Sequence, residues 1–155
     1  MSPNDPANLE EKKEFVTFTS GDQNFCLGIM QIKEIRRWSR VTVLPHAPKD
    51  VLGVMNLRGA VIPIYDLSAR FGFGTTPANE RNVVIIATIE TQTVGLLVQS
   101  VSEILSVDAS IIQDTPDIKS EATQQTIVGV ISIEDDMTRI IDLNAVIDPI
   151  ERMAS

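Results

Sequence analysis

Two parts of this chain carry the same pattern of residues in the same order. Residues 25–35 can be aligned with residues 94–104, and further matches follow downstream in both parts. The identical positions are Glu34 and Glu103, Gly53 and Gly129, Asp66 and Asp142, and Leu67 and Leu143. Because Val and Ile match by chance in any β-rich chain, these identities carry the argument for an internal duplication. The duplication predicts two similar small β-barrels, each capped by a short helix, packed together with a groove between them.

The core of each unit must be built mainly from Val, Ile and Leu. Hydrophobic residues make up 43% of the chain, whereas aromatic residues make up only 5%. This balance favours β-structure over a helix bundle. Short apolar runs at residues 15–19, 24–29, 83–89 and 94–98 are separated by turn residues, as expected for strands. We therefore predict a mainly β fold.

One predicted hairpin presents a charged side chain. Residues 54–57 and 60–65 are β-prone runs joined by Arg58 and Gly59. Gly can adopt the positive φ that a two-residue turn needs, so Arg58 should stand at the hairpin tip, available for recognition. Asp66 follows the second run and is well placed as the N-cap of a short helix.

The net charge narrows the class of partner. Thirteen Lys and Arg against twenty-one Asp and Glu give a net charge of −8, which opposes attraction to nucleic acid and to anionic lipid. No apolar run approaches ~18 residues, and no export signal is recognisable, so we expect a cytoplasmic protein without direct membrane insertion. A local basic patch is still a candidate site, with ordinary solvated charge as the equal alternative. Its members are Lys33, Arg36, Arg37, Arg40 and Arg58.

Residue types suited to catalysis are scarce. One His and one Cys cannot form the common metal sites, and no Gly-rich phosphate loop occurs. His46 shares its expected loop with no nucleophile, and Cys26 lies in an apolar strand as a core residue would. Asp66 and Asp142 each stand where a helix needs a cap. The sequence predicts no enzyme, no metal and no cofactor.

The block of residues 56–67 resembles the signature of CheW-like chemotaxis coupling proteins. In that family an Asn-Leu-Arg-Gly turn is followed by an apolar strand that carries Pro and then by Asp-Leu, as here. Residues 32–36 and 94–105 are similar to two further family elements. The resemblance covers about residues 15–150 and implies two similar five-stranded SH3-like β-barrel subdomains packed together, with short helices.

Composition and the resemblance together predict a domain layout. Residues 1–14 contain two Pro, two Asn and a run of charges without an apolar period, which predicts a disordered tail. A single CheW-like domain over residues 15–150 would follow it. Within it, subdomain 1 would span about 15–80 and exchange strands with the second half. Subdomain 2 would span about 81–142, and a C-terminal helix would span about 143–153.

The family implies a non-enzymatic adaptor. It would link the cytoplasmic tips of chemoreceptors (methyl-accepting chemotaxis proteins) to the regulatory domain of a histidine kinase of similar fold, in a signalling array that includes rings with the kinase. By resemblance, the receptor-binding residues are Ile32, Glu34, Gly53, Arg58, Gly95 and Val101. The kinase contact would lie near residues 113–118, with Gln113 and Ile118 as its members.

These residues divide by chemistry. Ile32 and Val101 would supply apolar contact, with barrel core as the alternative; Glu34 and Arg58 would supply charge selectivity. The two glycines would allow close backbone approach.

Three features depart from the family pattern, and other functions remain open. Gln113 stands where some relatives have Arg, Gln99 replaces an acidic residue that is common after the apolar strand, and Arg37 and Trp38 stand where a small residue is common. Trp38 is either an exposed anchor or a packed lid. The alternatives are the coupling protein of a pilus-type or other chemosensory system and a free-standing β-barrel regulator that binds a ligand or peptide. A small enzyme that uses Asp66 or His46 is weaker still.

Overall fold

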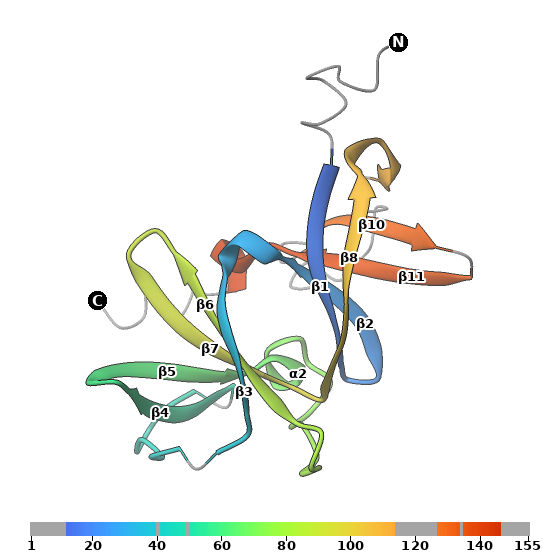
Figure 1. Ribbon diagram of the computed structural model, residues 1–155. Helices are drawn as coiled ribbons and strands as arrows, with labels where there is room; N and C mark the ends of the chain where they lie inside the picture. Colours follow the sequence, from blue (N-terminus) through green and yellow to red (C-terminus); the bar gives the residue numbers. More distant parts are fainter. Residues whose placement is uncertain (1–11, 40, 49, 114–126, 134, 147–155) are drawn as a thin grey trace. The chain divides into compact units, whose positions relative to one another are not determined.

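The structure is a computed structural model, and it describes residues 12–39, 41–48, 50–113, 127–133 and 135–146 (Figure 1). These residues form β-strands with short helices between them, which confirms the mainly β prediction. The first half contains β1 (Lys12–Ser20), β2 (Gln23–Gly28), η1 (Ile29–Gln31), β3 (Ile32–Arg37), β4 (Val51–Leu57), β5 (Ala60–Asp66) and α2 (Leu67–Arg70). The second half contains β6 (Val83–Ile89), β7 (Gln92–Val98), β8 (Ser100–Asp108), η2 (Ala109–Ile111), β9 (Ile112–Gln113), β10 (Ile127–Ile133) and β11 (Asp136–Ile141).

The strands form two sheets with the same internal order. One sheet has the order β3-β6-β7-β5-β4, and the other has the order β8-β1-β2-β11-β10-β9. Replacing each strand of the first sheet by its partner from the sequence repeat gives the first five strands of the second sheet. The second sheet has one strand more than the five predicted, because the two-residue strand β9 also pairs with β10.

The strand register confirms the internal repeat. Each sheet contains one parallel pair, in which Ile64 lies opposite Gly95 and Ile140 lies opposite Cys26. The sequence alignment places Cys26 on Gly95, and Ile64 on Ile140. The antiparallel hairpins agree as well, because the register shifts just before Gly53 in one and just before its counterpart Gly129 in the other.

The chain divides into two compact units that interleave along the sequence. One unit holds residues 1–17, 24–29 and 102–155, and the other holds residues 18–23 and 30–101. The strand pairing accounts for this division, because β6 pairs with β3 and β7 pairs with β5. The hairpin formed by β6 and β7 therefore completes the sheet of the first half.

The predicted ends of the chain lie largely outside the described residues. Strand β1 begins at Lys12, so the last three residues of the predicted tail over 1–14 are part of a strand. Residues 143–146 form a helical turn at the start of the predicted C-terminal helix.

Each unit has its own apolar core, built mainly from aliphatic side chains. In the unit with β3 to β7 the buried cluster is Met55, Leu57, Ile62, Ile64, Val84, Ile86 and Leu97. In the other unit the cluster is Phe15, Cys26, Val107, Ile131 and Ile140. Burial raises the pKa of the Cys26 thiol to about 12, as expected for a core cysteine in apolar surroundings.

The β4 edge of the five-stranded sheet is closed by a short return of the chain. Thr42 N donates to Val54 O, and Val54 N donates to Thr42 O, both at 2.8 Å. Gly53 makes this approach possible, since a Cβ built there would collide with the Thr42 carbonyl oxygen. The other unit repeats the arrangement, because Gln113 pairs with Val130. Pairing of an edge strand in this way satisfies backbone groups that would otherwise be open to another chain.

Asp66 is a helix cap and an anchor for the loop that follows. Its side chain is almost fully buried and accepts a hydrogen bond from Ala69 N at 3.4 Å. Thr76 donates to the same carboxylate from its backbone N at 2.8 Å and from its Oγ1 at 2.5 Å. The predicted capping role is confirmed, and the carboxylate is fully engaged in holding the fold.

Candidate functional site

The turn between β4 and β5 has the geometry that the sequence predicts. Leu57 pairs with Ala60, and the two residues between them have φ angles of 51° at Arg58 and 89° at Gly59. Two successive positive φ values are the mark of a two-residue hairpin turn. Asn56 Oδ1 accepts a hydrogen bond from Gly59 N at 3.0 Å, which braces the turn. The turn therefore presents the Arg58 side chain, which is 66% exposed.

Strand β3 supplies the partners of Arg58. Residues of β3 alternate between half-buried and exposed, so Ile32, Glu34 and Arg36 share one face. Glu34 lies opposite Ile86, and Arg36 lies opposite Val84. Both of these β6 residues belong to the core, so a carboxylate on this face needs compensating partners.

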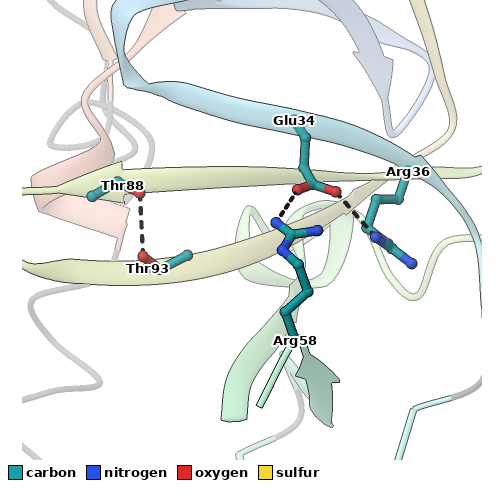
Figure 2. Close-up of polar contacts among 5 residues, drawn as sticks. All are labelled: Glu34, Arg36, Arg58, Thr88 and Thr93. Carbon is teal, nitrogen blue, oxygen red and sulfur yellow. Dashed lines mark hydrogen bonds and ion pairs between the residues drawn. The ribbon is translucent and has the colours of Figure 1, made fainter. Parts of the chain in front are cut away.

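Two arginines converge on the Glu34 carboxylate (Figure 2). Arg58 Nη2 donates to Oε2 at 2.6 Å, and Arg36 Nη1 donates to Oε1 at 3.0 Å. The side chains of Glu34 and Arg36 are 29% and 40% exposed, respectively. The Arg36 contact lies along β3, and the Arg58 contact joins β3 to the β4–β5 turn. Since β3 and β4 are the two ends of the strand order, the second contact requires the sheet to curl toward closure.

The arginines also set the ionisation of Glu34. Hydrogen bonds from Arg58 and then from Arg36 hold the pKa of this carboxyl below its usual value of 4.5. The carboxylate is therefore ionised at neutral pH, and the cluster carries two positive charges and one negative charge. We call Glu34, Arg36 and Arg58 the arginine–carboxylate cluster.

The two candidate glycines lie on strands β4 and β7. Gly53 and Gly95 are both buried. A Cβ at Gly95 would collide with Ile64 Cδ1 and would lie 2.9 Å from Val84 Cγ1. Each glycine thus permits a close approach between parts of this chain, and an effect of either position on binding would act through the barrel.

The remaining candidate residues fall into separate places. Ile32 and Val101 are half-buried, which fits both predicted roles, apolar contact and barrel core. All six predicted receptor-binding residues lie in the unit of residues 18–23 and 30–101. Gln113 is exposed on β9 of the other unit, and Ile118 lies outside the described residues.

Sequence reasoning missed the place of Arg36 in the site. From the sequence, Arg36 was predicted only as one member of a basic patch. The two-residue period of a strand places Arg36 on the same face as Glu34, and this was the signal that could have found it. Its neighbour Arg37 lies on the opposite face and is exposed.

A small polar cavity occurs in the same unit. It encloses about 200 Å³ and is lined by Thr19, Pro77, Asn79, Arg81, Asn82, Gln99 and Ser100. Asn82 Nδ2 donates to Pro77 O at 2.9 Å and fixes the loop that forms one wall of the cavity.

His46, which the sequence offered beside Asp66 as a candidate for catalysis, is exposed and has a φ of 62°.

Within the part of the chain that the structure describes, no group of three or more His, Cys, Asp or Glu side chains is arranged to hold a metal ion. None of the helices there has the length and hydropathy needed to span a bilayer.

A duplicated β-scaffold with a charged surface cluster has the features of a protein-interaction module. Comparison with known proteins gives the family. Residues 14–151 match the family model of the CheW-like domain. The chain belongs to the CheW-like family, and the resemblance drawn from its sequence is confirmed.

Individual relatives agree with this assignment. The chain is 46% identical over 143 residues to the chemotaxis protein CheW of Rhizobium meliloti, covering 92% of each protein. It is 30% identical to the chemotaxis protein CheW of Klebsiella aerogenes, covering 92% of this chain and 85% of that one. Among solved structures, it is similar to the scaffolding protein TtCheW from Thermoanaerobacter tengcongensis. That match has a TM-score of 0.81 at 30% identity and covers 88% of this chain and 92% of the other.

Proposed function

We propose that this protein is a non-enzymatic adaptor that couples the cytoplasmic tips of chemoreceptors to a chemotaxis histidine kinase. The observation that carries the proposal is the match to the CheW-like family over residues 14–151. The relatives compared above are named as chemotaxis proteins, and the similar solved structure is a scaffolding protein. These names favour a chemotaxis array over a pilus-type system.

The receptor would bind the unit that carries the arginine–carboxylate cluster. A receptor tip is a helical hairpin, and an amphipathic helix needs both an apolar strip and a polar edge to dock. Half-buried Ile32 and Val101 offer the apolar part, and exposed Arg58 offers the polar part. Gly53 and Gly95 would support this surface from beneath.

The kinase would bind the other unit. Gln113 is exposed on the short edge strand β9, which offers a limited surface for a second domain of similar fold. A pseudo-symmetric contact between duplicated domains can repeat and close into rings. Ile118 would be the apolar anchor of that contact.

The proposal includes a cytoplasmic location at the receptor array, reached through protein partners. It includes no cofactor and no nucleic acid, in keeping with the net charge of −8.

Calorimetric titration tests the two contacts separately. The full chain is titrated into the isolated regulatory domain of a chemotaxis kinase from the same organism, and separately into a soluble receptor fragment that carries the signalling tip. We expect saturable binding to both, with Ile118→Ala weakening the kinase contact and Arg58→Ala weakening the receptor contact. The absence of wild-type binding to either partner would overturn the proposed function.

A further inference from the structure

The arginine–carboxylate cluster has a net positive charge. Glu34 contributes one negative charge, and Arg36 and Arg58 contribute two positive charges. The surplus is local, because the chain as a whole carries a net charge of −8. An acidic partner would be repelled by much of this protein but attracted to this cluster.

The two guanidinium groups are held close together with donors to spare. Both bind the Glu34 carboxylate, one at each oxygen atom, so this single group bridges the two guanidinium groups. A guanidinium carries five N–H donors, and the contacts to Glu34 use one nitrogen of each arginine. Arg36 and Arg58 remain 40% and 66% exposed. Figure 2 shows the two groups approaching Glu34, one from its own strand β3 and the other from the β4–β5 turn.

Arg36 is poorly explained as a structural residue alone. Its Nε is buried and finds no hydrogen-bond partner among the described residues, which carries a desolvation cost. A simple surface ion pair would recover little of that cost. A second carboxylate, bound by the outward donors of both arginines, would form charge-assisted hydrogen bonds of the strong kind.

We propose that Arg36 and Arg58 together form a carboxylate-binding pair, and that the receptor side chain they recognise is an Asp or Glu. Glu34 is the intrachain member that holds the two guanidinium groups in place. Arg36 becomes a recognition residue in addition to those that the family resemblance implies. This inference rests on the proposed receptor contact and names its chemistry.

The neighbouring residue provides a matched control. Arg36→Gln and Arg37→Gln remove the same charge from adjacent positions of β3, but the two side chains lie on opposite faces of the strand. Long-range attraction would respond equally to both changes. Binding of a carboxylate by the cluster responds to the first change alone.

The experiment is calorimetry of the full chain with the soluble receptor fragment. We expect Arg36→Gln to weaken binding at least ~10-fold, as the loss of a charge-assisted hydrogen bond does, and Arg37→Gln to stay within ~2-fold of wild type. Arg36→Lys keeps the charge but not the fork of donors, so it should fall between them. Binding of the Arg36→Lys variant also tests the inference if Arg36→Gln does not fold.

A partner scan completes the test. Each Asp or Glu of the receptor tip is changed to its amide, and one of these changes should lose its effect when combined with Arg36→Gln. Equal losses for Arg36→Gln and Arg37→Gln, or additive effects throughout the scan, would overturn the inference while leaving receptor binding intact. A wild-type chain that does not bind the fragment would instead overturn the proposed function, and this inference with it.

Discussion

Gly53→Ala is the substitution for which the structure makes the sharpest prediction. Gly53 has a φ of +154°, and a Cβ there would collide with the backbone carbonyl of Thr42. The obstacle is main chain, so it cannot move aside as a flexible side chain would. We expect backbone strain of ~2 kcal/mol and the weakening of two hydrogen bonds that join Thr42 and Val54, worth ~1 kcal/mol net. The total loss in free energy of unfolding is then ~3 kcal/mol, and for a chain of this size the melting temperature falls by ~6–12 °C.

Two other glycines separate the causes of this loss. Gly59 has a φ of +89° and no atom within 4 Å of its built Cβ, so Gly59→Ala measures backbone strain alone, ~1 kcal/mol. Gly129 is the repeat counterpart of Gly53, and its built Cβ lies 3.0 Å from Ile112 Cγ2 and 3.2 Å from Gln113 O. Gly129→Ala therefore measures a milder crowding of the same kind of closure, ~1–2 kcal/mol.

Urea unfolding followed by circular dichroism gives the three free energies, and receptor binding is measured on the same samples. A Gly53→Ala loss no larger than that of Gly59→Ala would refute the steric argument. A variant that is as stable as wild type but no longer binds the receptor fragment would show instead that Gly53 touches the partner directly.

Three further outcomes are expected. Asp66→Ala should lower the free energy of unfolding in urea by ~3 kcal/mol, since it removes the helix cap and both Thr76 hydrogen bonds. Asp142→Ala removes only an exposed contact to Asn144 N and should cost ~1 kcal/mol. Equal losses for the two variants would contradict the anchoring role of Asp66. The arginines lower the pKa of Glu34 below 4.5, so the stability that this ion pair contributes should be complete above pH 4.5 and lost as pH falls through the lower folded-state pKa. An NMR titration checks this, and a Glu34 midpoint at or above 4.5 would contradict it. Burial raises the pKa of the Cys26 thiol to about 12, so a disulfide reagent at pH 8 should react only after urea is added; immediate reaction would place the thiol at the surface.

The repeat in the sequence made most of the fold predictable. Turn residues and short apolar runs locate the strands, and positive φ at Gly59 follows from the two-residue turn it must form. The division into units was harder, because it depends on which hairpin pairs with which. Pairing of β6 with β3 is a contact between distant parts of the chain, and the alternation of residues in β3 does not specify its partner.

The members of the arginine–carboxylate cluster were named from the sequence, but their arrangement was not. The hairpin pattern predicted an exposed Arg58, and the family resemblance added Glu34 as a separate contributor of charge. Their hydrogen bond depends on the curl of the sheet, which brings the β4–β5 turn to β3. Arg36 joins Glu34 along β3 itself, because the two-residue period of the strand places both side chains on one face.

The sequence of the second repeat lacks the arginines of this cluster. Glu34 has the counterpart Glu103, but Arg36 is aligned with Leu105, and Arg58 is aligned with Glu134. In the second unit it is the backbone of Glu103 that makes a contact, since Glu103 N donates to Thr17 Oγ1 at 3.2 Å. The two barrels thus share their strand order and register, while the charge on the equivalent turn is opposite in sign. Because the two copies have similar shapes, shape alone does not distinguish them. This reversal of charge favours binding of an acidic partner to the barrel that carries Arg58 over binding to its duplicate.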